Sequence, residues 1–271
     1  MFKRILIYTG YSVITIALAA YFYLSSQLVT AESRQLSCKT IEVIILDSAY
    51  NRFVSRSEIK GLLNEEGIKT GQSKLAEINQ HHLEQVINNR TAVKVSHVSY
   101  TRSGNLRVHI TQRRPIIRLE TVNGGFYMDD SAYIFPLIRS FTSYVPVVTG
   151  ELALSLPPGY RGEGDLEDKK IAGLYNMALF LDQNQDWNAM IEQIYVDSHG
   201  ILYMTPRAGK TEIIFGTPEN IEYKFKKLDS FYKKVVPAMG WDAYSTVDLS
   251  FSNQLVCKKT EKHQENKQIK T

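Results

Sequence analysis

The first hydrophobic feature of the chain is an uncharged run from Ile5 to Leu24. At a rise of 1.5 Å per residue, a helix of about twenty residues crosses the roughly 30 Å hydrocarbon layer of a bilayer. Lys3 and Arg4 stand immediately before the run, and basic residues favour the cytoplasmic side of a membrane. The pattern therefore predicts a cytoplasmic stub of residues 1–4, a transmembrane helix of residues 5–24, and export of all that follows.

Two alternatives compete with this anchor. Val29, Thr30 and Ala31 offer the small or branched residues of a processing site, as in a cleaved secretion signal. Such a signal has an apolar core of about 7 to 15 residues, which is shorter than this run, so the length favours an uncleaved anchor. A buried globular helix would show a charged face, and the run contains no charged residue.

After a polar linker of residues 25–37, a first domain is expected over residues 38–119. Its signals include capping-box spacing from Ser55 to Glu58 and strict alternation of apolar and polar residues over 106–111. The pattern predicts, in order, a strand over 41–46, a helix from Ser55 to Gly67, a helix over 79–88, and strands over 93–100 and 106–111. The expected order is β-α-α-β-β.

A second, mainly antiparallel β domain with two helices is expected over residues 120–257. After its first strands, the pattern predicts a helix over 165–181, a meander of strands over 191–196, 201–205 and 212–215, and a helix from Thr217 to Pro237. Thr217 is the expected N-cap of this second helix, with Pro218 at its first position.

The last apolar pattern has a period of two. Every second residue from Val247 to Cys257 falls on one face, with Asn253 as the polar exception, which predicts one continuous, half-buried strand. Residues 258–271 are polar and are expected to form a disordered tail. The predicted fold class is α+β, preceded by the transmembrane helix.

Charge argues against nucleic-acid binding. The chain of 271 residues has a formal net charge of +4, and five lysines and two glutamates after Cys257 supply +3 of it. The folded body is therefore close to neutral, whereas a nucleic-acid footprint needs basic residues clustered on a folded face. The two cysteines, Cys38 and Cys257, are too few for a disulfide framework, and we expect them to be mostly unbridged.

No group of residues has the spacing of a catalytic, metal or cofactor site. His81 and His82 are adjacent and cannot share one helix face, and the neighbouring carboxylates of Asp129 and Asp130 favour a turn. Residues 209–211 imitate the end of a phosphate loop, but Met204 stands where that loop requires glycine. We therefore expect no enzyme, no cofactor and no small-molecule substrate.

The first domain resembles a POTRA domain. The residues that carry the resemblance are Leu75, Ile78, Leu83, Val86, the segment Ala92-Val93-Lys94-Val95, and Leu106 to Ile110 followed by Gln112-Arg113-Arg114-Pro115-Ile116. A single anchor followed by one such domain resembles the bacterial cell-division family FtsQ/DivIB.

The resemblance extends into the second domain. Phe126-Tyr127-Met128-Asp129, Phe135-Pro136-Leu137 and Val145 to Gly150 are similar to the entry into that family's β domain. The family often has glycine in the turn after the aspartate, and this chain has Asp130-Ser131-Ala132 there instead. This departure concerns the geometry of the turn and not the resemblance to the family.

The family resemblance implies a non-enzymatic, bitopic scaffold of the divisome. It would lie in the cell inner membrane at the septum, with a cytoplasmic N-terminus and periplasmic domains, and recruit FtsB/FtsL-type partners through its terminal strand. The implied partner-binding positions are Val247, Leu249, Phe251, Asn253 and Leu255, with Arg113 and Arg114 at the end of the POTRA domain. The two arginines could instead mark a hinge.

Two other functions remain open from the sequence. A POTRA-bearing periplasmic assembly or secretion chaperone would normally precede an outer-membrane barrel, and no series of amphipathic strands of about ten residues follows here. A membrane-tethered periplasmic enzyme would need the reactive constellation that the sequence lacks.

Overall fold

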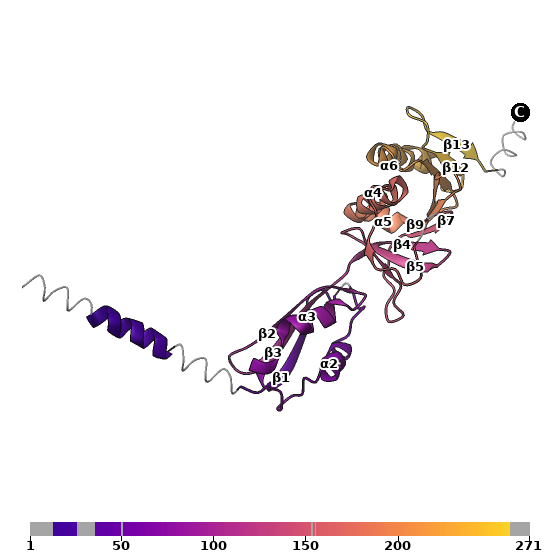
Figure 1. Cartoon of the computed structure of the whole chain (residues 1–271). Helices are drawn as coiled ribbons and strands as arrows, with labels where there is room; N and C mark the ends of the chain where they lie inside the picture. Colours follow the sequence, from indigo (N-terminus) through magenta and orange to yellow (C-terminus); the bar gives the residue numbers. More distant parts are fainter. Residues whose placement is uncertain (1–12, 26–35, 50, 153, 155, 261–271) are drawn as a thin grey trace, which may run out of the picture. The chain divides into compact units, whose positions relative to one another are not determined.

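The computed structural model describes residues 13–25, 36–49, 51–152, 154 and 156–260. The chain divides into two compact units, Met1–Gln112 and Arg113–Thr271; Figure 1 shows the elements of each. Residues 13–25 are helical, and Leu24 lies in this helix. Among the described helices, none combines the length and apolar character that crossing a membrane requires. Ile5 and the predicted stub lie outside the described residues.

The first unit contains a three-stranded sheet and two α-helices in the predicted β-α-α-β-β order, which is confirmed. Its elements are β1 (Thr40–Ile45), α2 (Arg56–Glu65), η1 (Leu75–Glu77), α3 (Gln80–Asn88), β2 (Val93–Tyr100) and β3 (Asn105–Gln112). The strand order is β1-β3-β2, with β1 parallel and β2 antiparallel to the central β3. The local capping signal is also confirmed, because the side chain of Ser55 accepts a hydrogen bond from the amide of Glu58 at 3.1 Å.

One face of this small sheet carries the core. Leu106, Val108 and Ile110 alternate along β3 and are fully buried, and Ile59 of α2 and Leu83 of α3 are also buried, where α2 packs on β1 and α3 on β2. The period of two in β3 and the helical spacing in α2 and α3 place apolar side chains on facing surfaces. This explains why local patterns were sufficient to predict the unit.

The second unit is built on one ten-stranded sheet in the order β13-β12-β11-β10-β9-β7-β4-β5-β6-β8. Its strands are β4 (Pro115–Thr121), β5 (Gly124–Asp129), β6 (Tyr133–Pro136), β7 (Val147–Gly150), β8 (Gly162–Glu163), β9 (Ile191–Val196), β10 (Leu202–Pro206), β11 (Glu212–Gly216), β12 (Tyr244–Asp248) and β13 (Val256–Lys259). The helical segments are α4 (Lys169–Gln183), α5 (Gln185–Met190), α6 (Ile221–Ser230), the π-helix η2 (Phe231–Val235) and α7 (Val236–Met239). The expected domain boundary at residue 119 thus falls inside β4, which pairs with β5 and β7.

The helices pack where the sheet has parallel pairs. Strands β7 and β9 are parallel and are joined through α4 and α5, while β11 and β12 are parallel and are joined through α6, η2 and α7. Parallel neighbours need such crossover connections. The two crossovers meet where the rings of Phe180 and Phe225 stack with centroids 4.6 Å apart, beside the buried Phe215 of β11.

The predicted start of the second long helix is wrong. The helix begins at Ile221 after Asn220, which has a left-handed φ of 52°, and not after Thr217. Pro218 instead packs against α4 so closely that a Cβ at Gly173 would lie 2.5 Å from its Cγ. The helical segment also passes Pro237, which is tolerated in the first turn of α7.

The prediction of one continuous strand over 247–257 is also wrong. Strand β12 ends at Asp248, and β13 returns antiparallel to it from Val256, with Asp248 opposite Val256. Lys258 and Lys259 belong to β13, so the expected disordered tail does not begin at residue 258. The cause is local turn chemistry, because the Asp248 carboxylate accepts hydrogen bonds from the amide of Ser250 at 2.8 Å and from its hydroxyl at 2.6 Å. We call residues 249–255 the terminal loop, and β12, this loop and β13 together the terminal hairpin.

Candidate functional site

The terminal hairpin forms one edge of the large sheet. Strand β13 pairs with β12 on one side, and in the described part of the chain no strand pairs with its other side. The amide of Thr260 donates to the carbonyl of Ala243 on the β12 side at 3.1 Å. Because successive residues of an antiparallel strand point their amides in opposite directions, the amide of Lys258 faces β12 and that of Cys257 faces outward. An edge of this kind can accept a strand from another chain.

Helix α6 holds the terminal loop in place. The ammonium group of Lys227 donates to the carbonyls of Leu249 at 2.7 Å and Phe251 at 2.6 Å, and the Tyr223 hydroxyl donates to the carbonyl of Ser252 at 2.7 Å. Burial lowers the pKa of Lys227, and the nearby carboxylate of Asp248 opposes this shift. These bonds fix the loop backbone, while Phe251 as a residue is 45% exposed.

The predicted contact residues fall into two groups. Val247 and Leu249 are fully buried, so their side chains belong to the core and cannot touch a partner of the folded domain. Phe251 and Asn253 are exposed on the terminal loop, and Leu255 is half-buried. The structure therefore does not place these five side chains on one accessible face, because only Phe251, Asn253 and Leu255 reach the surface.

A groove of about 680 Å³ runs between the terminal hairpin and the helical segment α6–η2. Leu255, Cys257 and Lys259 line it from the hairpin. The residues that line it from α6 and η2 include Tyr223, Lys227, Ser230 and Lys234, which sequence reasoning missed. Their spacing of three or four residues puts them on one helix face. This row of mixed polar and aromatic residues beside the apolar row was the sequence signal that could have indicated the groove.

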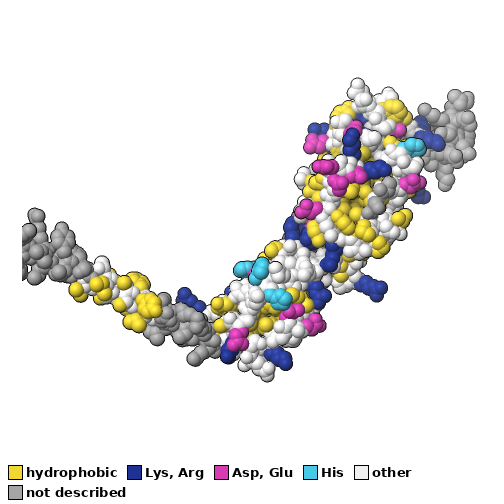
Figure 2. Space-filling view, viewed as in Figure 1, with side chains coloured by type: hydrophobic (Ala, Val, Ile, Leu, Met, Phe, Trp, Pro, Cys, Tyr) yellow, Lys and Arg dark blue, Asp and Glu magenta, His cyan; other side chains and the backbone are white. Residues whose placement is uncertain are grey.

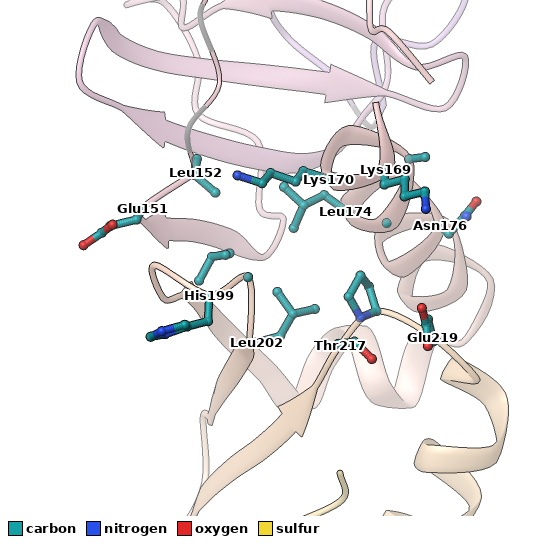
Figure 3. Close-up of a pocket in the computed structure, with 15 residues that line it drawn as sticks. Glu151, Leu152, Lys169, Lys170, Leu174, Asn176, His199, Leu202, Thr217 and Glu219 are labelled. Carbon is teal, nitrogen blue, oxygen red and sulfur yellow. The ribbon is translucent and has the colours of Figure 1, made fainter. Parts of the chain in front are cut away.

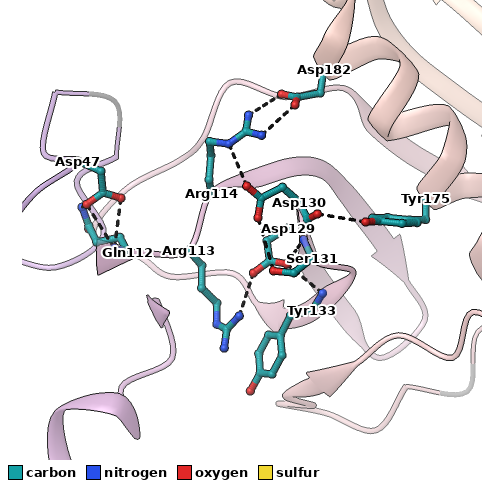
Figure 4. A network of polar contacts seen from close by, with 10 residues as sticks. All are labelled: Asp47, Gln112, Arg113, Arg114, Asp129, Asp130, Ser131, Tyr133, Tyr175 and Asp182. Carbon is teal, nitrogen blue, oxygen red and sulfur yellow. Dashed lines mark hydrogen bonds and ion pairs between the residues drawn. The ribbon is translucent and has the colours of Figure 1, made fainter. Parts of the chain in front are cut away.

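The side chain of Arg113 is held inside the second unit. Its guanidinium donates to the Asp129 carboxylate at 2.8 Å, with side-chain exposures of 13% and 0%, and lies 3.3 Å from the ring centre of Tyr133 (Figure 4). Asp129 also accepts hydrogen bonds from the amides of Ser131 and Tyr133, which confirms its predicted turn role. Arg113 therefore joins the start of β4 to the turn between β5 and β6.

The side chain of Arg114 also forms ion pairs within the second unit. It makes two hydrogen bonds to the Asp182 carboxylate of α4, at 2.6 and 2.8 Å, and a third to Asp130 at 3.3 Å (Figure 4). The bond to Asp182 is the main cause that raises the pKa of Arg114 above its ordinary value. Both arginines thus make ion pairs within the second unit, with the Arg113 side chain largely buried and the Arg114 side chain 46% exposed.

A second cavity of about 430 Å³ lies between α4, the ends of β7 and β10, and the loop that contains Pro218. Leu152, Leu174 and Leu202 give it an apolar wall, while Lys170 and Glu219 are among the charged residues at its rim (Figure 3). Charges of both signs surround it and select no ligand class. Among the described residues, no cluster of three or more His, Cys, Asp or Glu residues could hold a metal ion.

Surface charge is also mixed on a larger scale. On the face shown in Figure 2, basic and acidic side chains are interspersed over the folded units. This distribution agrees with the near-neutral charge of the folded body.

Comparison with known proteins identifies both units. Residues 114–258 match the family model described as FtsQ/DivIB, C-terminal related, and this match covers more than half of the chain. This chain belongs to the FtsQ/DivIB family. Residues 36–111 match the model of a POTRA-like domain. The matched FtsQ/DivIB region extends from β4 into β13 and so contains most of the terminal hairpin.

A curated member of this family gives a second comparison. The cell division protein FtsQ of Rhodothermus marinus is 27% identical to the chain over 170 residues, which is 60% of this chain and 59% of the relative. The FtsQ/DivIB chain described here therefore aligns with less than two thirds of the curated relative.

Proposed function

We propose that this protein is a non-enzymatic scaffold of the bacterial division machinery that recruits an FtsB/FtsL-type partner to the septum. Membership of the FtsQ/DivIB family supports a role in cell division, as does the name of the Rhodothermus relative. The observation that carries the recruitment proposal is the edge of β13, which has no strand on its outer side among the described residues.

Recruitment would combine backbone and side-chain contacts. A partner segment adds as a further strand, because main-chain hydrogen bonds at a sheet edge supply affinity without a preformed pocket. The exposed ring of Phe251 adds an aromatic anchor beside the ladder. Lys227 and Tyr223 hold the terminal loop in a fixed conformation before binding, which reduces the entropy that association costs.

The edge can be tested with two proline substitutions and one control. Cys257→Pro removes an outward amide and should abolish recruitment of the FtsB-type partner while circular dichroism stays unchanged. Lys258→Pro removes an amide that faces β12 and should unfold the hairpin. Cys257→Ala keeps the amide and should bind like the original protein. If Cys257→Pro folds and still recruits the partner normally, the β13 edge is not the docking site.

The proposed topology places the N-terminus in the cytoplasm and both folded units in the periplasm. Lys3 and Arg4, before the uncharged run, support this orientation. A reporter fused after Thr271 should be active only when exported. Depletion of the protein should produce filamentous cells, since a failed septum leaves growth without division. A C-terminal reporter that is active in the cytoplasm would reverse the topology, and normal cell length after depletion would remove the division role.

A further inference from the structure

We infer that the groove beside the terminal hairpin selects a partner segment in which acidic and apolar side chains share one face of a strand. This inference rests on the proposed function, because it specifies the chemistry of the segment that adds to β13. It is carried by the composition of the groove, the charges at its rim and the alternation of β13.

The groove has an apolar floor. Val235, Tyr244 and Leu255 line it, and each is a partly buried residue packed against the core of the second unit. Phe231 also lines the groove and is only 3% exposed, so it belongs to the buried part of the floor. The wider turn of the π-helix η2 carries both Phe231 and Val235, and such turns are often found at functional sites. Apolar side chains of a partner would lose contact with water here.

The rim of the groove is cationic. Lys234 of η2 and Lys259 of β13 both line it, and no ion pair joins either one to an Asp or Glu among the described residues. Lys227 differs, because its ammonium group already donates to two loop carbonyls. Two ammonium groups without an ion pair to any described carboxylate, beside an apolar floor, complement a segment that carries carboxylates next to apolar side chains.

The alternation of β13 fixes which partner residues meet the groove. Cys257 and Lys259 line the groove, whereas Val256 and Lys258 do not and alternate with them along the strand. A strand added beside β13 has the same period, so every second side chain lies over the groove. Within this set, glutamate or aspartate would face Lys234 and Lys259, and apolar residues would face the floor.

The chain's own residues 261–271 complement the groove poorly. Their three lysines and two glutamates give a formal side-chain charge of +1, the same sign as the rim of the groove. Like charges oppose their binding at low ionic strength. The occupant that fits by charge is therefore a segment of another protein.

The test uses matched charge reversals in the full chain, purified in detergent. Lys234→Glu with Lys259→Glu reverses the two groove lysines. Lys233→Glu with Lys258→Glu makes the same change in net charge at neighbouring positions outside the groove, where Lys233 already pairs with Asp229 at 2.9 Å. The probe is a blocked strand-forming peptide of about eight residues, with leucine and glutamate alternating on one face and threonine on the other.

Binding of the peptide should weaken about tenfold in the groove variant and less than about twofold in the control variant, since two partly exposed ion pairs are lost. A peptide with lysine in place of glutamate should show the reverse preference for the groove variant. Raising the salt to about 1 M should remove most of the difference between the variants, because the Debye length falls to about 3 Å.

If the double glutamate variant of the groove does not fold, the double substitution Lys234→Gln with Lys259→Gln is used in its place. It removes the two charges without reversing them. The inference is overturned if the groove and control variants bind the peptide equally, or if the lysine peptide binds the original protein as well as the glutamate peptide does. The same variants assayed with the FtsB-type partner separate the two claims. If all variants recruit that partner equally, only the groove inference falls; if the original protein recruits none, the proposed function falls with it.

Discussion

Replacing Lys227 with methionine tests whether helix α6 positions the terminal loop. Methionine keeps an unbranched apolar stem of similar length and removes the ammonium group, so the carbonyls of Leu249 and Phe251 lose their donor. The bond to Leu249 is partly buried and the bond to Phe251 is exposed, so water can replace only the second readily.

The structure sets the size of the expected effect. A hydrogen bond to a charged group contributes about 1.5 to 3 kcal/mol when it is buried, and less when water competes for it. The substitution also removes an ammonium group whose pKa is lowered by burial, which offsets part of the loss. We therefore expect Lys227→Met to lower the free energy of unfolding of the second unit by about 1.5 kcal/mol. In a unit of this size that corresponds to a fall in Tm of roughly 3 to 6 °C.

Thermal unfolding and amide hydrogen exchange measure the two parts of this effect. Exchange should accelerate in residues 249–255 more than in β9 or β10, because the loop loses its support while the central strands keep theirs. Lys226→Met is the matched control, since Lys226 is exposed and its side chain makes no contact with the terminal loop among the described hydrogen bonds. It should change stability by less than about 0.5 kcal/mol.

The reasoning fails if Lys227→Met and Lys226→Met behave alike. Equal Tm values and equal exchange in residues 249–255 would mean that the two carbonyl contacts do not hold the loop in solution. If exchange accelerates but partner binding is unchanged, the loop is held by Lys227 without being part of the docking surface.

Three further predictions concern Phe251, Arg113 and the two cysteines. Phe251→Ala should weaken partner binding about thirtyfold, as for an aromatic hot spot of about 2 kcal/mol, and unchanged binding by a folded variant would place the contact elsewhere. Arg113→Met should destabilise the second unit by about 3 kcal/mol or more, because it leaves the buried Asp129 carboxylate without its cation; a stable variant with impaired partner recruitment would instead support a contact role. Iodoacetamide at pH 8 should alkylate Cys38 and Cys257 more slowly in the folded than in the unfolded chain, because burial raises the pKa of each thiol and so reduces the reactive thiolate. Reduction should leave the gel mobility of the protein unchanged. Equal labelling rates or a mobility shift would contradict this prediction.

The sequence by itself determined the elements whose signals are local. The capping box at Ser55, the alternation along β3 and the apolar faces of α2 and α3 are each complete within about ten residues, so the β-α-α-β-β unit was predicted correctly. The apolar strands β9, β10 and β11 were located to within a residue or so for the same reason. The motifs of both regions were sufficient to indicate the FtsQ/DivIB family, which the family models confirm.

Only the tertiary structure decided how the candidate site is built. Apolar residues continue to alternate at every second position through Leu249 and Leu255. This alternation therefore could not show that Asp248 bonds to Ser250 and that the chain turns back on itself there. Arg114 and Asp182 are 68 residues apart, and their pairing depends on the crossover that brings α4 to β4. The groove likewise needs η2 and β13 to be adjacent, which follows from the parallel pairing of β11 with β12. A pattern along the chain reports which face of an element is apolar, whereas the partner of each polar side chain is set by contacts between distant segments.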